Sequence, residues 1–131
     1  MLFLDSAGIA GPIASRLRQL GHKNVQEVNF GSDSPDPKCR FMRDFMWQKM
    51  KEWLLSGAID KHHELEADLT GPGIRPDNRQ RVWLESKETM KKRGVDSPDD
   101  GDALALTFAA EVRVPKATRP APSMPRTFAW A

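Results

Sequence analysis

Residues 97–108 include two aspartates whose type and spacing suit metal chemistry. Pro98 cannot sit inside a helix but suits the first turn of one. Asp99 and Asp102 follow and are three residues apart, so on a helix they share one face. Two carboxylates at a fixed spacing are oxygen ligands of the kind that a hard divalent cation prefers. The segment therefore predicts a helix over 99–111 with acids at its start.

A structural role is the alternative for these acids. An aspartate at a helix start accepts hydrogen bonds from free N–H groups and interacts favourably with the helix dipole. Ser97 and Asp99 are both suitable N-cap residues for this helix. Judged on this segment alone, capping is the commoner use of such residues, and a metal role needs support from elsewhere in the chain.

Asp5 supplies that support from the other end of the chain. It follows the apolar residues 2–4, which predict a buried strand, and it precedes a turn rich in glycine. In open α/β sheets, ligands bind outside the carboxyl ends of the strands. Asp5 with Asp99 or Asp102 would then bind Mg²⁺ or Mn²⁺, as in phosphodiester hydrolysis by metal-activated water. Capping of the following turn is the alternative role for Asp5.

The first 30 residues predict a strand, a helix and a second strand. The helix falls on residues 12–20 and the second strand on 25–30, which together with the first strand form a βαβ unit containing a parallel pair. The most regular pattern of the chain follows at 40–56, where aromatic and methionine residues recur at helical spacing. We interpret this stripe as core.

The remaining patterns are shorter. Residues 64–69 and 86–93 predict two helices, and a hairpin turned at Asp77-Asn78 joins strands near 71–75 and 82–85. Four prolines interrupt the chain after Val114, which predicts a poorly ordered tail over 113–131.

Composition narrows the class of protein. A chain of 131 residues forms one domain with a modest core, and 39% hydrophobic with 29% charged residues is ordinary for a globular protein. No apolar run approaches the ~20 residues that cross a bilayer, so no membrane association is expected. The start lacks the basic region of a signal peptide. A single cysteine, Cys39, excludes an internal disulfide and predicts a cytoplasmic location.

The basic residues are clustered, although the net charge of +2 is too small to predict nucleic-acid binding by itself. Arg75, Arg79 and Arg81 come first, and a second group follows on the predicted helix over 86–93. We expect the second group to hold a DNA backbone, with a solvated helix face as the alternative. Its members are Lys87, Lys91, Lys92 and Arg93.

His62-His63 with Glu64 contains residue types that bind metals. Adjacent histidines point in different directions on a regular element, so an exposed loop is the favoured interpretation.

A series of short motifs runs through the chain in order. It comprises Phe3-Leu4-Asp5 with Gly8 and Gly11, Arg16-Leu17-Arg18-Gln19-Leu20-Gly21, Val28-Asn29-Phe30-Gly31, Arg43-Asp44-Phe45-Met46-Trp47, Leu55-Ser56-Gly57-Ala58-Ile59, Leu84-Glu85-Ser86-Lys87, Met90-Lys91-Lys92-Arg93-Gly94 and residues 97–108. In order and spacing this series resembles the nuclease domain of the large terminase subunit of tailed bacteriophages. The resemblance extends from residue 2 to about residue 110.

The resemblance implies an RNase H-like fold, a mixed sheet flanked by helices, whose acids bind two divalent metals. It implies an endonuclease that cuts double-stranded DNA concatemers during packaging, with the portal and the small terminase subunit as partners. By position Asp5 matches the family's second acid. The third acid matches Asp99 or Asp102, which the pattern does not separate, while Asp100 fits less well.

Two departures from the family qualify this expectation. The family's first acid lies on a strand upstream of the segment that begins here, and no Gly-rich ATPase loop ending in Lys-Ser or Lys-Thr occurs in the chain. We therefore expect residues 1–112 to be a partial, N-terminally truncated nuclease domain that cleaves weakly or not at all alone. Its unpaired sheet edges predict self-association. The alternatives are a non-catalytic prophage remnant or assembly module of the same fold, or another RNase H-fold nuclease such as a resolvase.

Overall fold

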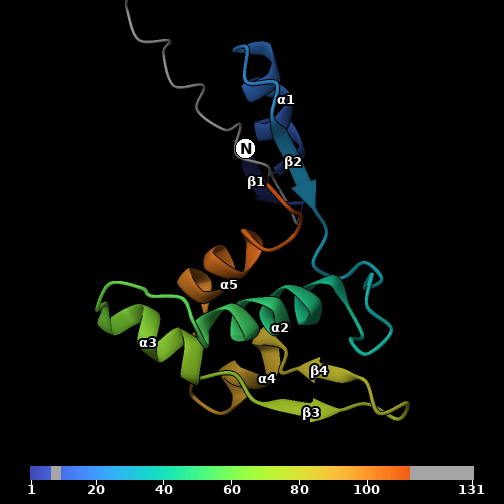
Figure 1. Cartoon of the computed structure of the whole chain (residues 1–131), viewed down its shortest axis with the longest axis vertical. Helices are drawn as coiled ribbons and strands as arrows, with labels where there is room; N and C mark the ends of the chain where they lie inside the picture. The colour runs from blue at the N-terminus through green and yellow to red at the C-terminus, as the bar shows by residue number, and fades with distance from the viewer. Residues whose placement is uncertain (7–9, 113–131) are drawn as a thin grey trace, which may run out of the picture.

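The computed structural model describes residues 1–6 and 10–112, which form a mixed α/β structure (Figure 1). In one sheet β1 (Leu2–Asp5) pairs in parallel with β2 (Val25–Val28), and in the other β3 (Ile74–Pro76) pairs antiparallel with β4 (Val82–Leu84). The helices of the described residues are α1 (Ala10–Gln19), α2 (Met42–Leu54), α3 (His63–Thr70), α4 (Lys87–Lys92) and α5 (Asp99–Leu106). The predicted tail over 113–131 lies outside the described residues.

The βαβ unit predicted for the first 30 residues is present. Leu2 lies opposite Val25 and Asp5 lies opposite Val28, and both valines are buried. The helix α1 packs on β2, and its buried residues are small alanines, which permit close approach of helix and strand. Asp5 therefore ends β1 at the carboxyl edge of a parallel pair, as the sequence predicts.

The helix α2 lies at the centre of the core. Met46 and Met50 are almost completely buried on it, and Trp47 is 7% exposed. These side chains cluster with Leu84 of β4 and Ala105 of α5, which confirms that the aromatic and methionine stripe is core. Figure 1 shows α5 between α2 and the β1–β2 pair, and α5 contacts both.

The sheets differ from the expected architecture. The described residues form two separate two-stranded sheets instead of one mixed sheet. The strand β4 packs on α2, while β1 packs on α5, so the two helices separate the sheets (Figure 1). The hairpin turn spans 77–81 and is longer than the predicted Asp77-Asn78 turn, because Asp77 accepts hydrogen bonds from the backbone N–H groups of Arg79 and Arg81.

The end of α5 also differs from the prediction. The helix ends at Leu106 instead of residue 111. Thr107 Oγ1 donates a hydrogen bond to the Leu104 carbonyl at 2.7 Å. The N–H groups of Thr107, Phe108 and Ala109 each bond to the carbonyl three residues back, so the α-helix is followed by a tighter turn of the 3₁₀ type.

The start of α5 is capped by another helix. The N-cap residue is Pro98, and neither Ser97 nor Asp99 provides the predicted cap. Asp68 of α3 instead accepts hydrogen bonds from the N–H groups of Asp100 and Gly101, at 2.8 and 3.1 Å. A Cβ atom on Gly101 would lie 3.0 Å from the Trp47 ring, so glycine at this position permits the close packing of α5.

Candidate functional site

Asp102 is buried where three helices meet, with 4% of its surface exposed. Its Oδ1 accepts hydrogen bonds from Arg43 Nε and Trp47 Nε1 of α2, both at 2.8 Å. Its Oδ2 lies 3.0 Å from Lys87 Nζ at the start of α4, an ion pair without an aligned hydrogen bond. This carboxylate therefore joins α5 to α2 and α4.

Asp99 lies near Asp102 but is open to solvent, with 77% of its side chain exposed. Its Oδ1 accepts hydrogen bonds from Ser97 Oγ at 2.7 Å and from Lys87 Nζ at 3.1 Å, and these two donors lower the pKa of Asp99. Burial alone would lower the pKa of Lys87, but the two carboxylates raise it. The structure thus brings Asp99 and Asp102 together around the ammonium group of Lys87.

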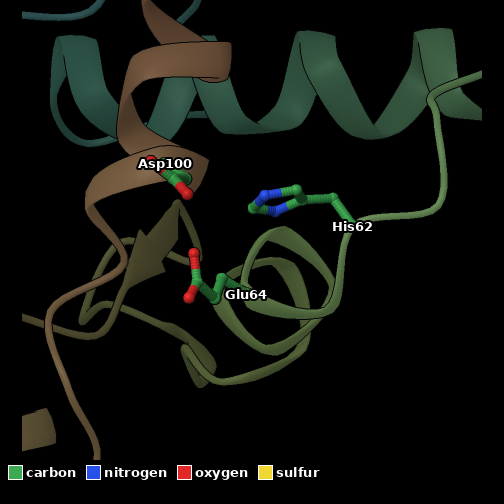
Figure 2. Close-up of side chains that lie close together, drawn as sticks. All are labelled: His62, Glu64 and Asp100. Carbon is green, nitrogen blue, oxygen red and sulfur yellow. The ribbon is translucent and has the colours of Figure 1, made fainter.

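Asp5 comes from a neighbouring element, since β1 contacts α5. Its carboxylate does not join Asp99 and Asp102 in a group of three that could share one ion. Among the described residues such a group occurs at His62, Glu64 and Asp100, whose ligand atoms lie within 4.8 Å of one another (Figure 2). The metal role predicted for Asp5, Asp99 and Asp102 stays a prediction.

Two charged residues lie inside the apolar stripe of α2, and the sequence patterns did not identify them as partners of the site: Arg43 positions Asp102, and Asp44 joins α2 to β4. Besides its bond to Asp102, Arg43 donates from Nη1 to the Glu85 carbonyl at 3.0 Å. Asp44 is 2% exposed and accepts hydrogen bonds from the N–H groups of Phe41 and Leu84, both at 2.8 Å. Burial raises the pKa of Asp44 despite these donors. Charged residues within an apolar helical stripe require buried partners, which is the signal that would have identified them.

The predicted DNA contacts fall into two groups. Lys87 is held by the two aspartates, and Arg93 donates to Glu85 from Nε at 2.9 Å and from Nη2 at 2.6 Å. The Arg93 guanidinium and the Gly73 N–H lower the pKa of Glu85 to about 2. Lys91 and Lys92 are exposed in the last turn of α4. Two of the four cations are therefore engaged within the protein.

A second cationic surface surrounds Trp83 of β4. The guanidinium carbons of Arg40 and Arg75 each lie 4.1 Å from the centroid of the Trp83 ring. Stacking on a ring leaves the N–H edges of a guanidinium available to anions. A groove beside the ring is lined by Arg40, Phe41 and Trp83, with Asp33 and the hairpin residues Asp77, Asn78, Arg79 and Arg81. We call Arg40, Arg75, Arg79, Arg81 and Trp83 the Trp83 surface.

Comparison with known proteins shows no match to a family model or to a curated protein. Within residues 1–6 and 10–112, no helix has the length and apolar character needed to span a membrane. The function therefore has to be inferred from the residues and their contacts.

Replacing Asp102 with asparagine tests its place in the fold. Loss of the negative charge leaves the Arg43 guanidinium buried without its counter-ion, so Asp102→Asn is expected to lower the free energy of unfolding by roughly 3–5 kcal/mol. Urea denaturation followed by tryptophan fluorescence measures the change. Asp99→Asn is the matched control on the same helix and is expected to change stability by less than about 0.5 kcal/mol, because Asp99 is exposed. Equal effects of the two substitutions would contradict a structural role for Asp102.

Proposed function

We propose that this chain is a DNA-binding part of a terminase-type, RNase H-like nuclease domain, and that alone it binds double-stranded DNA but cleaves it weakly or not at all. The packing of α5 against β1 carries this proposal (Figure 1). The strand ends in Asp5, and the helix begins with the segment that contains Asp99 and Asp102. The acids assigned by the resemblance to the terminase family thus come from elements in direct contact.

The family implies Mg²⁺ or Mn²⁺ at these acids, and carboxylate oxygens are suitable donors for either ion. The contacts of the pair do not fit such an ion. Lys87 Nζ lies 3.1 Å from Asp99 and 3.0 Å from Asp102, where an ion shared by the two carboxylates would have to bind. The other oxygen of Asp102 accepts from Arg43 and Trp47. Because Lys87 and Arg43 already neutralise Asp99 and Asp102, we assign no step of metal-assisted hydrolysis to these two acids.

Binding of DNA is supported by the Trp83 surface. Arg40 and Arg75 are exposed or half-buried, and within the described residues neither guanidinium forms an ion pair with a carboxylate. Their stacking on Trp83 limits side-chain motion, so less conformational entropy is lost when they contact phosphates. Contacts of this kind bind the DNA backbone without reading its sequence.

A non-catalytic module of the same fold is the second candidate function. The contact of Lys87 with both acids favours it, because a fixed ammonium group removes the negative charge that would attract a metal. Such a module would contribute DNA binding or assembly to packaging, and cleavage would come from other residues.

Nicking of supercoiled plasmid DNA in the presence of Mn²⁺ tests whether the chain cleaves DNA by itself. We expect the chain to produce little or no relaxed plasmid above the protein-free control, because Lys87 and Arg43 neutralise the acids of α5. Asp5→Asn is the matched variant and is expected to behave like the unmodified chain. Metal-dependent nicking that Asp5→Asn abolishes would overturn the weak-cleavage proposal and establish an active nuclease.

Two double variants that remove equal charge identify the DNA-binding surface. Arg40→Gln with Arg75→Gln alters the Trp83 surface, while Lys91→Gln with Lys92→Gln alters α4. We expect the arginine variant to weaken binding to a duplex of arbitrary sequence more strongly. Because each lost phosphate contact reduces the slope of log K against log salt by about 0.9, the arginine variant should reduce the slope by about 2. Fluorescence anisotropy at several salt concentrations measures both quantities.

Two results would contradict this assignment. If the lysine variant produced the larger loss, DNA would contact α4, as the clustered basic residues of that helix predict. If the unmodified chain failed to bind duplex DNA at low salt, the DNA-binding proposal itself would be wrong.

A further inference from the structure

We propose that His62, Glu64 and Asp100 form a binding site for a divalent transition-metal ion of the Zn²⁺ type. Their ligand atoms lie within 4.8 Å of one another. Figure 2 shows the His62 ring and the two carboxylates directed toward one another across the space between α3 and α5. His62 is the N-cap of α3, Glu64 lies in the first turn of that helix, and Asp100 lies in the first turn of α5.

The protein brings these ligands together through contacts of its own. Asp68 of α3 accepts hydrogen bonds from the N–H groups of Asp100 and Gly101, which fixes the start of α5 against α3. Gly101 permits this approach because a Cβ atom at this position would lie 3.0 Å from the Trp47 ring and 3.3 Å from Asp68 Cβ. The position of Asp100 relative to α3 is thus set by residues that would not bind the ion, so the site is preorganised.

The set of donor atoms indicates the class of metal. One imidazole nitrogen and two carboxylate oxygens are ligands that Zn²⁺ accepts in a three-residue site with a further position open to water. Mg²⁺ and Ca²⁺ prefer oxygen ligands alone, so the histidine favours a transition metal. Acids at helix starts also complement the helix dipole and His62 caps α3, but neither role requires ligand atoms from two helices to lie within 4.8 Å of one another.

The charges around the site favour a bound cation. Within the described residues, neither Glu64 nor Asp100 forms an ion pair with a lysine or arginine, whereas Asp99 and Asp102 of the same helix both contact Lys87. Two carboxylates this close to each other repel, and a cation between them would remove the repulsion.

Binding of an ion would change one hydrogen bond of α3. His62 Nδ1 accepts from the Leu65 N–H at 3.3 Å, a long contact. A neutral imidazole has one nitrogen lone pair, so the ring either accepts this N–H or binds a metal. Occupation of the site should therefore release the Leu65 N–H, which gives a second signal of binding at this histidine.

Calorimetric titration of the untagged full chain with Zn²⁺ tests the proposal, with the adjacent His63 supplying the control. We expect one Zn²⁺ per chain and a loss of affinity of roughly tenfold or more in His62→Asn. Asparagine is a good N-cap residue, so this variant keeps the start of α3. His63→Asn should bind like the unmodified chain, and Asp100→Asn should bind more weakly because it removes the ligand from α5.

Two results would contradict the proposed Zn²⁺ site. One is no binding of Zn²⁺ by the unmodified chain, and the other is equal Zn²⁺ affinity in the unmodified chain and in His62→Asn. A shift of the Leu65 amide resonance on addition of Zn²⁺ should accompany binding in the unmodified chain and be absent in His62→Asn. The titration uses no DNA and does not alter Asp5, so its failure would leave the proposed DNA-binding function standing.

Discussion

The buried carboxylate of Asp102 is the contact on which the arrangement of the helices depends. It accepts hydrogen bonds from Arg43 and Trp47 of α2 and forms an ion pair with Lys87 of α4. The helices α2, α4 and α5 therefore meet at one buried charge. A carboxylate taken out of water is costly unless cations and hydrogen bonds replace the solvent. Arg43 extends the connection, because it also donates to the carbonyl of Glu85 just after β4. The placement of α5 between α2 and β1 therefore depends on this contact.

The helical periodicity of α5 gives its three acids different surroundings. Asp99 and Asp102 share a face and both contact Lys87, one exposed and the other buried. Asp100 lies one residue further along than Asp99 and is directed toward His62 and Glu64 (Figure 2). The three neighbouring aspartates are thus divided between a contact with Lys87 and a separate group of side chains that could bind a metal. The contact of Asp99 and Asp102 with Lys87 supports our proposal that the chain alone cleaves DNA weakly or not at all.

Patterns of neighbouring residues predicted most helices and strands. Features that these patterns did not predict depend on contacts between residues far apart in the sequence. The parallel pair ending in Asp5 and the core helix α2 follow from apolar periodicity, which neighbouring residues alone determine. The cap of α5 by Asp68 and the approach of Asp100 to His62 join residues more than 30 positions apart. The separation of the two sheets has the same origin, since it requires α2 and α5 to pack between them. No pattern within a single segment contains this information.

A double-mutant cycle between Arg43 and Asp102 tests the central claim, that their buried contact organises the fold. The free energies of unfolding of Arg43→Gln, Asp102→Asn and the double variant are compared with that of the unmodified chain. We predict that the double variant is less destabilised than the sum of the single changes, with a coupling energy of about 1–3 kcal/mol. Additive effects within about 0.5 kcal/mol would contradict the account, because they would show that the two side chains contribute to stability independently.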